Sequence, residues 1–498
     1  MAGLVEDHRP IATPTKTLLL FVAAITLVRL ILAAVIPLTE DEAYYRLWAS
    51  SLQLGYYDHP PMIAWWIRAG MTLAGDSSLG VRLLPALSSG LTSLLVFDLA
   101  QRLGGSVKVA ERSAIWFNAA FLIGAGGFLA TPDSASTPFW VLTLWALTRS
   151  EQGRPAPWWL AAGAFAGLAT ISKYSALFLG PGVLIWLALR PGGFRRLLTP
   201  WPWLAGLIAA AIFATNVEWN ATHHWAAFAK QFGRVAPGRI APQFLLELIV
   251  GQILLLNPAI AWFAGKGLWR WRKREANSGQ RDLTLIVATS APFAAYLVLH
   301  SLHDRVQAHW PAPLYPGLII CAAMAAETVP LAGVQAVLKK IAAPLGLGLS
   351  ALVLLHMALP ITDLKRTRDP AEEVRDWPAF AQSVEAARAA DHAAWIGTVS
   401  YGVAGQLSNQ PAIKSPVAEL VERDRYPPGE GSWRADLSQP GLVVDLDRRL
   451  NAQMLSRCFA QVAPERELAR GRPGYKPTAY AAFLVSGPKR DILHQGCQ

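Results

Sequence analysis

The chain has 498 residues, of which 53% are hydrophobic and only 16% are charged, and its mean hydropathy is +0.29. Soluble globular proteins usually carry about 25% charged residues, so this composition excludes an ordinary soluble protein and places most of the chain in a lipid bilayer. The formal net charge is +11. In a polytopic membrane protein such an excess of Lys and Arg lies in cytoplasmic loops, so the charge does not indicate a nucleic-acid partner, and we expect none.

The first apolar segment covers residues 17–37 and follows the basic residues His8, Arg9 and Lys16. It is longer than the apolar core of a signal peptide and has no small-residue cleavage site, so we interpret it as a retained membrane span. Further apolar segments bring the total to about eleven, which predicts a mainly α, polytopic helix bundle over residues 1–359. These segments are 79–100, 109–130, 135–148, 157–171, 174–189, 201–217, 243–264, 282–300, 311–327 and 341–359.

Basic residues are distributed unevenly between the two sides of this bundle. If the N-terminus is cytoplasmic, every turn on the cytoplasmic side contains Lys or Arg, as the positive-inside rule requires. These turns hold Arg102, Lys108 and Arg112; Arg149 and Arg154; Arg190, Arg195 and Arg196; the run 266–274; and Lys339 with Lys340. An odd number of spans then places residues 360–498 on the outer side.

Residues 360–498 are polar and are predicted to form a small periplasmic α/β domain. "HAAWIGTV" (392–399), "GLVVDLD" (441–447) and "YAAFLV" (480–485) have the composition of strands, and residues 371–390 that of a helix. Cys458 and Cys497 lie in this region. In an oxidising compartment they would form a disulfide, and two free thiols are the alternative. Cys321 lies in an apolar run and is expected to be a small core residue.

The first external loop, residues 38–78, combines many aromatic residues with acidic ones. Apolar and aromatic residues between Glu42 and Leu54 recur at helical spacing, which suits a helix lying in the membrane interface. Pro61 would open a second short helix. Asp41 then lies at the start of the first helix and Asp58 at the turn between the two. Capping these helices is an alternative role for both residues, but ionisable residues gathered at a membrane surface indicate a functional site.

The stretch "DEAYYRLWASSLQLGYYDHPPMIAWWIRAG" (41–70) resembles the first external loop of bacterial membrane glycosyltransferases of the GT-C fold. These are relatives of the protein O-mannosyltransferases and of the transferase that adds aminoarabinose to lipid A. Four more segments resemble the same family in the same order: "TPDSASTPFW" (131–140), "AGLATISKYSALFLGPG" (166–182), "WNATHHW" (219–225) and "AHWPAPLYPGL" (308–318). The resemblance covers residues 17–330. It implies a GT-C bundle in the bacterial inner membrane with its catalytic loop facing the periplasm.

The resemblance also implies a reaction. A hexosyl or pentosyl group would be transferred, with inversion, from a polyprenyl-phosphate carrier to an acceptor outside the cytoplasm. Lipid A or the lipopolysaccharide core is the first expectation for the acceptor, and another envelope glycan or a protein hydroxyl is the alternative. An interfacial carboxylate can act as general base, and the resemblance assigns that role to Asp41. The leaving phosphate needs cations, for which we expect Lys173 and Arg305 before Lys230, Arg234 and Arg239.

Further candidates for the donor or acceptor site are Glu42, Tyr45, Asp58, His59 and Asp133. By resemblance, Asp58 and His223 correspond to a metal pair that would hold zinc, magnesium or manganese. This chain has Asp58 where the lipid A aminoarabinose transferase has Glu, and His59 where that enzyme has Lys. We expect Asp133 to cap a helix that starts at Ser134 rather than to act directly in catalysis, although matching family positions lie near the site. For His223 the alternative is an interfacial side chain hydrogen-bonded beside Trp219 and Trp225.

Two other classes of function compete with an enzyme. One is a transporter or flippase for a lipid-linked sugar, and the other is a scaffold that binds envelope components. The sequence shows no internal repeat of the kind common in transporters, and few acidic residues lie within the spans. It also shows no Gly-rich phosphate loop for a nucleotide sugar. Turnover of a polyprenyl-phosphate sugar would distinguish the enzyme from both alternatives.

Overall fold

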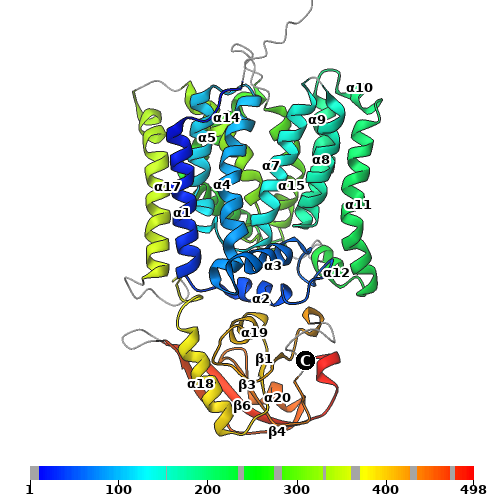
Figure 1. Ribbon diagram of the computed structural model, residues 1–498, viewed down its shortest axis with the longest axis vertical. Helices are drawn as coiled ribbons and strands as arrows, with labels where there is room; N and C mark the ends of the chain where they lie inside the picture. The colour runs from blue at the N-terminus through cyan, green and yellow to red at the C-terminus, as the bar shows by residue number, and fades with distance from the viewer. Residues whose placement is uncertain are drawn as a thin grey trace, which may run out of the picture.

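The computed structural model describes residues 11–152, 154–233, 240–273, 283–328, 332–359, 369, 371–426, 435–471 and 477–497. In these residues the chain forms a helical bundle and a smaller α/β domain, which lies below the bundle in Figure 1. Among the described residues, the last helix of the bundle is α17 (Val334–Ala358), and the domain division near residue 359 stays a prediction.

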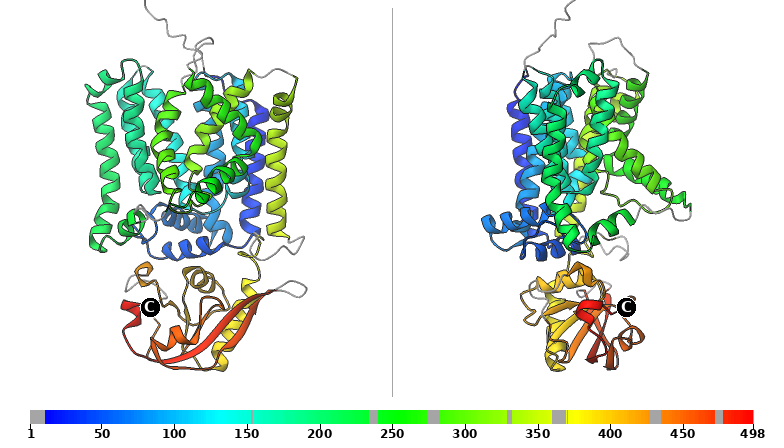
Figure 2. Two further views of the ribbon diagram at one scale, coloured as in Figure 1. Left: turned by 180° about the vertical axis from the view of Figure 1, so that it is seen from behind. Right: turned by 90° about the vertical axis from the view of Figure 1, so that its right-hand side faces the viewer.

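The helices of the bundle lie beside one another along the long axis of the molecule (Figures 1 and 2). Most predicted apolar segments coincide with one helix each. The helices are α1 (Lys16–Val35), α4 (Ser78–Arg102), α5 (Val107–Ala119) with the short α6 (Phe121–Gly126), α7 (Pro132–Ser150), α8 (Pro155–Thr170), η1 (Tyr174–Phe178) with α9 (Leu179–Leu189), α11 (Trp201–Thr222), α14 (Pro258–Arg272), α15 (Thr284–His300), α16 (Tyr315–Glu327) and α17.

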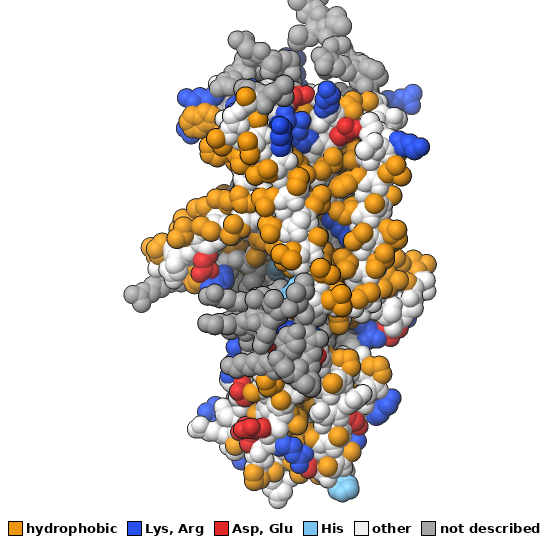
Figure 3. Space-filling view, turned by 90° about the vertical axis from the view of Figure 1, so that its left-hand side faces the viewer, with side chains coloured by type: hydrophobic (Ala, Val, Ile, Leu, Met, Phe, Trp, Pro, Cys, Tyr) orange, Lys and Arg blue, Asp and Glu red, His pale blue; other side chains and the backbone are white. Residues whose placement is uncertain are grey.

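Among the described residues, four helices are long and apolar enough to cross a membrane by themselves: α1, α4, α11 and α17. Many of their large apolar side chains, such as Leu27 and Ile31 of α1, are exposed on the bundle surface. Figure 3 shows the result as a broad band of hydrophobic side chains across one face of the bundle, with Lys and Arg gathered at its upper end. An apolar belt of this kind suits contact with lipid rather than water.

The predicted span 243–264 is wrong as a single helix. The structure has two helices there, α13 (Gln243–Leu256) and α14, bent by 108°. Asn257 ends α13 with a positive φ of 80°, which Asn adopts more readily than most other non-glycine residues. Its side chain accepts from the Ala259 N–H at 3.1 Å and so caps α14, where Pro258 takes the first position. The apolar pattern alone does not reveal this turn.

Two short helices, α2 (Glu40–Trp48) and α3 (Met62–Ala74), lie across the lower end of the bundle, as predicted for the first external loop (Figure 1). The capping roles considered for the two aspartates are wrong. Thr39 caps α2, in a capping box whose second member is Glu42, and α3 follows Pro61 without a side-chain cap. Asp41 lies within the first turn of α2, and Asp58 precedes α3 in the loop.

The α/β domain contains one mixed sheet with the strand order β2-β1-β3-β6-β4, and β5 also pairs with β6. Strands β1 (Trp395–Thr398), β2 (Val417–Glu419) and β3 (Gly441–Leu446) are parallel, with Ile396 opposite both Val417 and Leu442. The long β6 (Thr478–Pro488) runs antiparallel to β3, to β4 (Phe459–Val462) and to β5 (Arg466–Arg470). The strands and the helix α18 (Trp377–Ala390) confirm the predicted α/β character.

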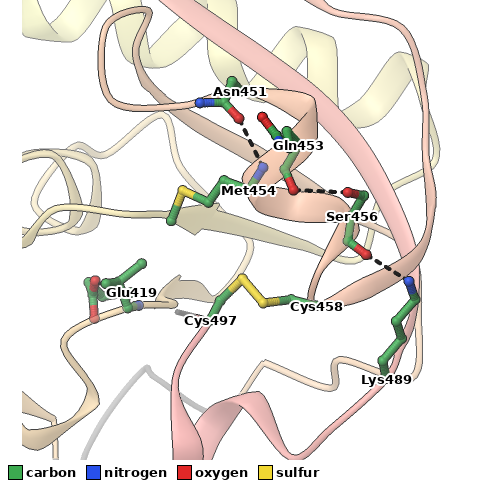
Figure 4. The surroundings of a disulfide bond; sticks show 9 residues. Glu419, Asn451, Gln453, Met454, Ser456, Cys458, Lys489 and Cys497 are labelled. Carbon is green, nitrogen blue, oxygen red and sulfur yellow. Dashed lines mark hydrogen bonds between the residues drawn. A yellow bond between two sulfur atoms is a disulfide. The ribbon is translucent and has the colours of Figure 1, made fainter.

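A disulfide joins Cys458 and Cys497, with their Cα atoms 5.6 Å apart (Figure 4). It ties the segment between α20 (Ala452–Ser456) and β4 to the end of the chain, which follows α21 (Ile492–Gln495). Both cysteines are buried against the sheet. Of the two alternatives that the sequence left open, the structure therefore has the disulfide, and Cys321 is a free, buried core residue as predicted.

The α/β domain contacts the bundle through α19 (Tyr401–Ser408), which packs against α2. A Cβ atom at Gly405 would lie only 2.8 Å from the backbone nitrogen of Tyr44, so the two helices approach closely there. Side-chain amides add hydrogen bonds, from Gln406 to the Leu38 carbonyl and from Asn409 to the Ala43 carbonyl, both 2.7 Å. The domain therefore covers the first external loop.

Candidate active site

Four acidic residues lie where the loop, the bundle and the α/β domain meet: Asp41 and Glu42 on α2, Asp58 in the loop, and Asp133 in the first turn of α7. Burying a carboxylate is costly unless a cation or hydrogen-bond donors compensate its charge. The partners of each carboxylate therefore indicate what it can do.

Glu42 holds the loop to the bundle. Both of its oxygens accept from the Arg82 guanidinium on α4, at 2.7 and 2.6 Å, and both side chains are fully buried. The Ala130 N–H donates to the same carboxylate at 2.8 Å. Burial would raise the pKa of Glu42, but the charge and hydrogen bonds of Arg82 outweigh it, and the pKa lies below its ordinary value. Glu42 is therefore a structural anion rather than a proton acceptor.

Asp58 is enclosed by cations. It forms ion pairs with Lys230 on α12 (Ala226–Gly233) and with Arg425 of the α/β domain, and it accepts from the Tyr44 hydroxyl at 3.0 Å. Burial would raise its pKa, but the charges of Arg425 and Lys230 hold the pKa below the ordinary value. Asp58 thus joins three segments that are far apart in the sequence.

Asp133 is paired with Lys173, whose Nζ lies 2.6 and 2.7 Å from the two carboxylate oxygens. The Nε2 atom of His309 lies 3.7 Å from the same carboxylate, and about half of that side chain, 48%, remains exposed. The capping role predicted for Asp133 is wrong, because α7 begins at Pro132 and Thr131 caps it. Its neighbour His309 and Lys173 provide basic groups beside the loop.

Asp41 differs from the other three. Its Oδ1 accepts from the Tyr401 hydroxyl of the α/β domain at 2.9 Å. Among the described residues, no Lys, Arg or His lies within ion-pair distance of it, whereas Glu42, Asp58 and Asp133 each have such a partner. Burial raises the pKa of Asp41, and the Tyr401 hydrogen bond offsets this only in part. Asp41 is consequently the carboxylate best suited to accept a proton.

His59 and Tyr45 complete the cluster. Their rings lie 6.0 Å apart between centroids, in an edge-to-face arrangement. Burial lowers the pKa of His59 to about 3, despite the nearby charge of Asp58. The imidazole is therefore neutral at physiological pH and supplies no charge to a phosphate. Tyr45 is buried, and its pKa is raised well above the ordinary value by burial and then by Asp41 and Asp58.

Two predicted site residues have other partners. Arg305 pairs with Glu247 on α13, at 2.7 Å, and both side chains are largely exposed. His223 stacks on Trp219, with ring centroids 4.1 Å apart, and its Nδ1 lies 2.8 Å from the Trp219 carbonyl oxygen. This is the interfacial role that the sequence offered as the alternative. Arg234 and Arg239 lie outside the described residues.

The arrangement does not fit a metal ion at Asp58. Its charge is already compensated by two cations, and His223 is engaged with Trp219. In the part of the chain that the structure describes, no group of three or more His, Cys, Asp or Glu side chains could hold a metal. Metal sites in proteins usually need three or four ligands. We derive no chemical step through a metal, and metal dependence stays a prediction.

Four residues of the site escaped the sequence reasoning: Arg82, His309, Tyr401 and Arg425. His309 lies inside a segment quoted for its resemblance, and Arg82 is a lone basic residue in an apolar run, which signals a buried partner. Tyr401 and Arg425 lie in the α/β domain, where no motif points to them. Only the packing of α19 on α2 brings them to the loop.

An apolar groove lies between α3, α8 and α11. Its position connects it to the site, because the Met62 N–H donates to the Ile171 carbonyl at 3.1 Å and Lys173 follows two residues later. The groove is lined by Trp65, Ile171, Ile208, Ala211, Ile212 and Thr215.

Comparison with known proteins agrees with this architecture. Residues 58–219 match the family model described as dolichyl-phosphate-mannose-protein mannosyltransferase. The lipid A galacturonosyltransferase RgtD of Rhizobium johnstonii is 29% identical over 289 residues, which are 55% of this chain and 58% of that protein. The undecaprenyl phosphate-alpha-4-amino-4-deoxy-L-arabinose arabinosyl transferase 1 of Pseudomonas fluorescens is 28% identical over 347 residues, 63% of this chain and 59% of its own length. The match thus spans less than two thirds of either relative.

The crystal structure of ArnT from Cupriavidus metallidurans bound to undecaprenyl phosphate superposes with a TM-score of 0.63 at 17% identity, over 96% of this chain and all of that one. The same protein in the apo state gives a TM-score of 0.63 at 15% identity. The fold is therefore that of the GT-C membrane glycosyltransferases. In sequence the chain is similar to the protein O-mannosyltransferase family model and to the arabinosyl transferases, in agreement with the predicted resemblance.

The roles assigned to Glu42 and Arg82 can be tested by breaking the pair. Arg82→Met leaves a buried carboxylate without its cation and should cost about 3–5 kcal/mol of stability, whereas the double variant Glu42→Leu/Arg82→Met should regain most of the loss. Thermal unfolding in detergent measures both. Arg305→Met, which breaks the exposed pair with Glu247, is the matched control and should have little effect. An equally small effect of Arg82→Met would contradict the structural role of Glu42.

Proposed function

We propose that the protein is an inverting glycosyltransferase that moves a sugar from a polyprenyl-phosphate carrier to lipid A or the lipopolysaccharide core. The observation that carries this proposal is Asp41, which has a phenol and no ion-pair partner among the described residues, whereas Glu42, Asp58 and Asp133 beside it are each paired with a cation. Two relatives act on lipid A or use an undecaprenyl-phosphate sugar according to their names, which supports this donor and this acceptor over a protein acceptor.

In this proposal Asp41 accepts the proton of the acceptor hydroxyl as the oxygen attacks the anomeric carbon. The bond from that carbon to the phosphate oxygen breaks on the opposite face, so the configuration inverts. A raised pKa brings a carboxyl closer to neutral pH and makes it a better base. The phosphate leaves with increased negative charge, which the Lys173 ammonium can stabilise. Burial lowers the pKa of His309, so His309 would act beside it as a neutral hydrogen-bond donor rather than as a cation.

We also propose eleven membrane crossings, with the site and the α/β domain in the periplasm. Basic residues gathered at the end of the bundle opposite the α/β domain support this orientation (Figure 3). So does the disulfide, because disulfides persist in oxidising compartments such as the periplasm. Helices shorter than a full span, such as α16, would cross where neighbouring helices bury them, as α16 is buried here.

This orientation predicts the labelling of native lysines. In spheroplasts, a membrane-impermeant amine reagent should modify the exposed Lys489 of the α/β domain and leave Lys108 and Lys340 unmodified. All three should react after the membrane is broken, which controls for intrinsic reactivity. Peptide mass spectrometry measures each site. Protection of Lys489 together with labelling of Lys340 would reverse the proposed orientation.

The apolar groove between α3, α8 and α11 is proposed to hold the tail of the polyprenyl donor, because it leads from the lipid-facing surface of α11 toward Lys173. Ala211→Trp fills the groove and should raise KM for the lipid donor at least about tenfold with little change in kcat, the pattern of lost uniform binding. Ala210→Trp, at the neighbouring exposed position outside the groove, is the matched control. Equal effects of both variants would remove the groove from the proposal.

The base is tested with purified protein, an undecaprenyl-phosphate sugar and lipid A, with mass spectrometry of the product. Asp41→Asn keeps the size of the side chain and an oxygen for the Tyr401 hydrogen bond, but the amide cannot take the proton. Turnover should fall at least about 100-fold, since a general base contributes about 10²–10⁴ in rate. In the same loop, Asp76→Asn removes an exposed carboxylate paired with Arg46 and should keep near wild-type turnover.

If Asp41→Asn keeps more than about a third of wild-type turnover, far above the range expected for a lost base, Asp41 is not the base. Modification of lipid A by a nucleotide sugar without a lipid carrier would overturn the proposed donor.

A further inference from the structure

We propose that the α/β domain completes the catalytic centre, with Tyr401 as a positioning residue for Asp41. This inference rests on the proposed function, because it takes Asp41 as the base. The contact joins residues 360 positions apart in the sequence: the Tyr401 hydroxyl donates to Oδ1 of Asp41 at 2.9 Å. A hydrogen bond at Oδ1 fixes the rotation of the carboxylate and leaves Oδ2 to receive the proton of the acceptor.

Tyr401 is itself held in place. It is the first residue of α19, which follows directly from β1 and lies against α2 through the close approach at Gly405. Its ring lies 5.0 Å from the ring of Tyr44, and the Arg425 guanidinium lies over it at 4.4 Å from the centroid. The phenol therefore reaches Asp41 from a rigid support rather than from a loose loop.

Arg425 supports Tyr401 from a second segment of the α/β domain. It belongs to η4 (Arg423–Arg425), which follows β2, and it pairs with Asp58 of the first loop and, at 2.8 Å, with Glu422. Its guanidinium also lies over the rings of Tyr44 and Tyr57, at 5.7 and 5.5 Å. Arg425 thus contacts η4, α19 and the loop at once. Tyr401 is therefore held both by its own helix and by Arg425.

Tyr401 and Arg425 both lie at the carboxyl ends of strands of the sheet. Strands β1 and β2 are parallel, and Tyr401 and Arg425 follow their carboxyl ends. In open α/β sheets this edge is where ligands bind, because the loops that follow parallel strands converge there. Here the carboxyl ends of β1 and β2 face the first external loop. The residues that follow these strands therefore lie beside the proposed base.

The electrostatic surroundings of Asp41 make this hydrogen bond important. More acidic than basic groups surround Asp41, and each acidic group destabilises its charged form. Besides Tyr401, the groups that interact with its charge are Glu40, Glu42, Tyr45, Asp58, His309 and Glu373. The Tyr401 hydroxyl stabilises the carboxylate, so its removal should raise the pKa of Asp41.

The test is the pH dependence of kcat/KM for Tyr401→Phe, with the undecaprenyl-phosphate sugar and lipid A. The base works as a carboxylate, so activity rises with pH through the pKa of Asp41 in the free enzyme. In the variant this acidic limb should move up by about one pH unit, which is about a tenfold loss below the limb. At higher pH the rate should stay within about threefold of wild type. The matched control is Tyr480→Phe, which removes a phenol bonded to Arg470 in the same domain.

The outcomes separate the two levels of the proposal. A uniform loss at every pH with an unmoved limb, or an unchanged profile, would overturn the positioning role of Tyr401 alone. A shift of the limb in Tyr480→Phe as well would assign the effect to general loosening of the domain and would also overturn it. Absence of turnover by the wild-type protein would instead overturn the proposed function, and this inference with it.

Discussion

The buried ion pair between Glu42 and Arg82 is the contact on which the rest of the site depends. It joins the first turn of α2 to the start of α4 in the bundle, and the same carboxylate accepts from the Ala130 N–H just before α7. A charge buried so deeply must keep its partner, because an unpaired ion in a low-dielectric surrounding is far more costly than the pair. The pair therefore fixes where α2 lies, and Asp41 is the residue before Glu42 on that helix.

The carboxylates of the site have different roles because they have different partners. Glu42 and Asp58 are stabilised as anions by Arg82, Lys230 and Arg425, and their pKa values lie below the ordinary range. Asp41 has a phenol in place of a cation and a raised pKa. Titratable groups with environments that push their pKa values apart are a common sign of acid–base chemistry. In this cluster the pKa values differ because the cations form ion pairs with Glu42 and Asp58 and not with Asp41.

The two parts of the molecule are coupled through the same small region. Arg425 and Tyr401 of the α/β domain contact Asp58 and Asp41 of the first loop, while Lys230 reaches Asp58 from α12. The loop therefore has contacts with the bundle on one side and the domain on the other. The α/β domain, which lies outside the family-model match, holds two of the side chains nearest to the proposed chemistry.

The sequence by itself determined the helical bundle, the interfacial helices of the first loop, the strands of the α/β domain and the residues Asp41, Asp58, Asp133 and Lys173 as neighbours of one site. The helices and strands follow from local information such as apolar periodicity and prolines that break helices, whereas the grouping of these site residues follows from the resemblance of short motifs to a known family. Only the tertiary structure decided that Glu42 is bound by Arg82, that Arg305 pairs with Glu247, and that Tyr401 and Arg425 reach the loop. Partners of this kind lie up to several hundred residues apart, and their pairing is set by how helices and strands pack in space, which no short stretch of sequence encodes.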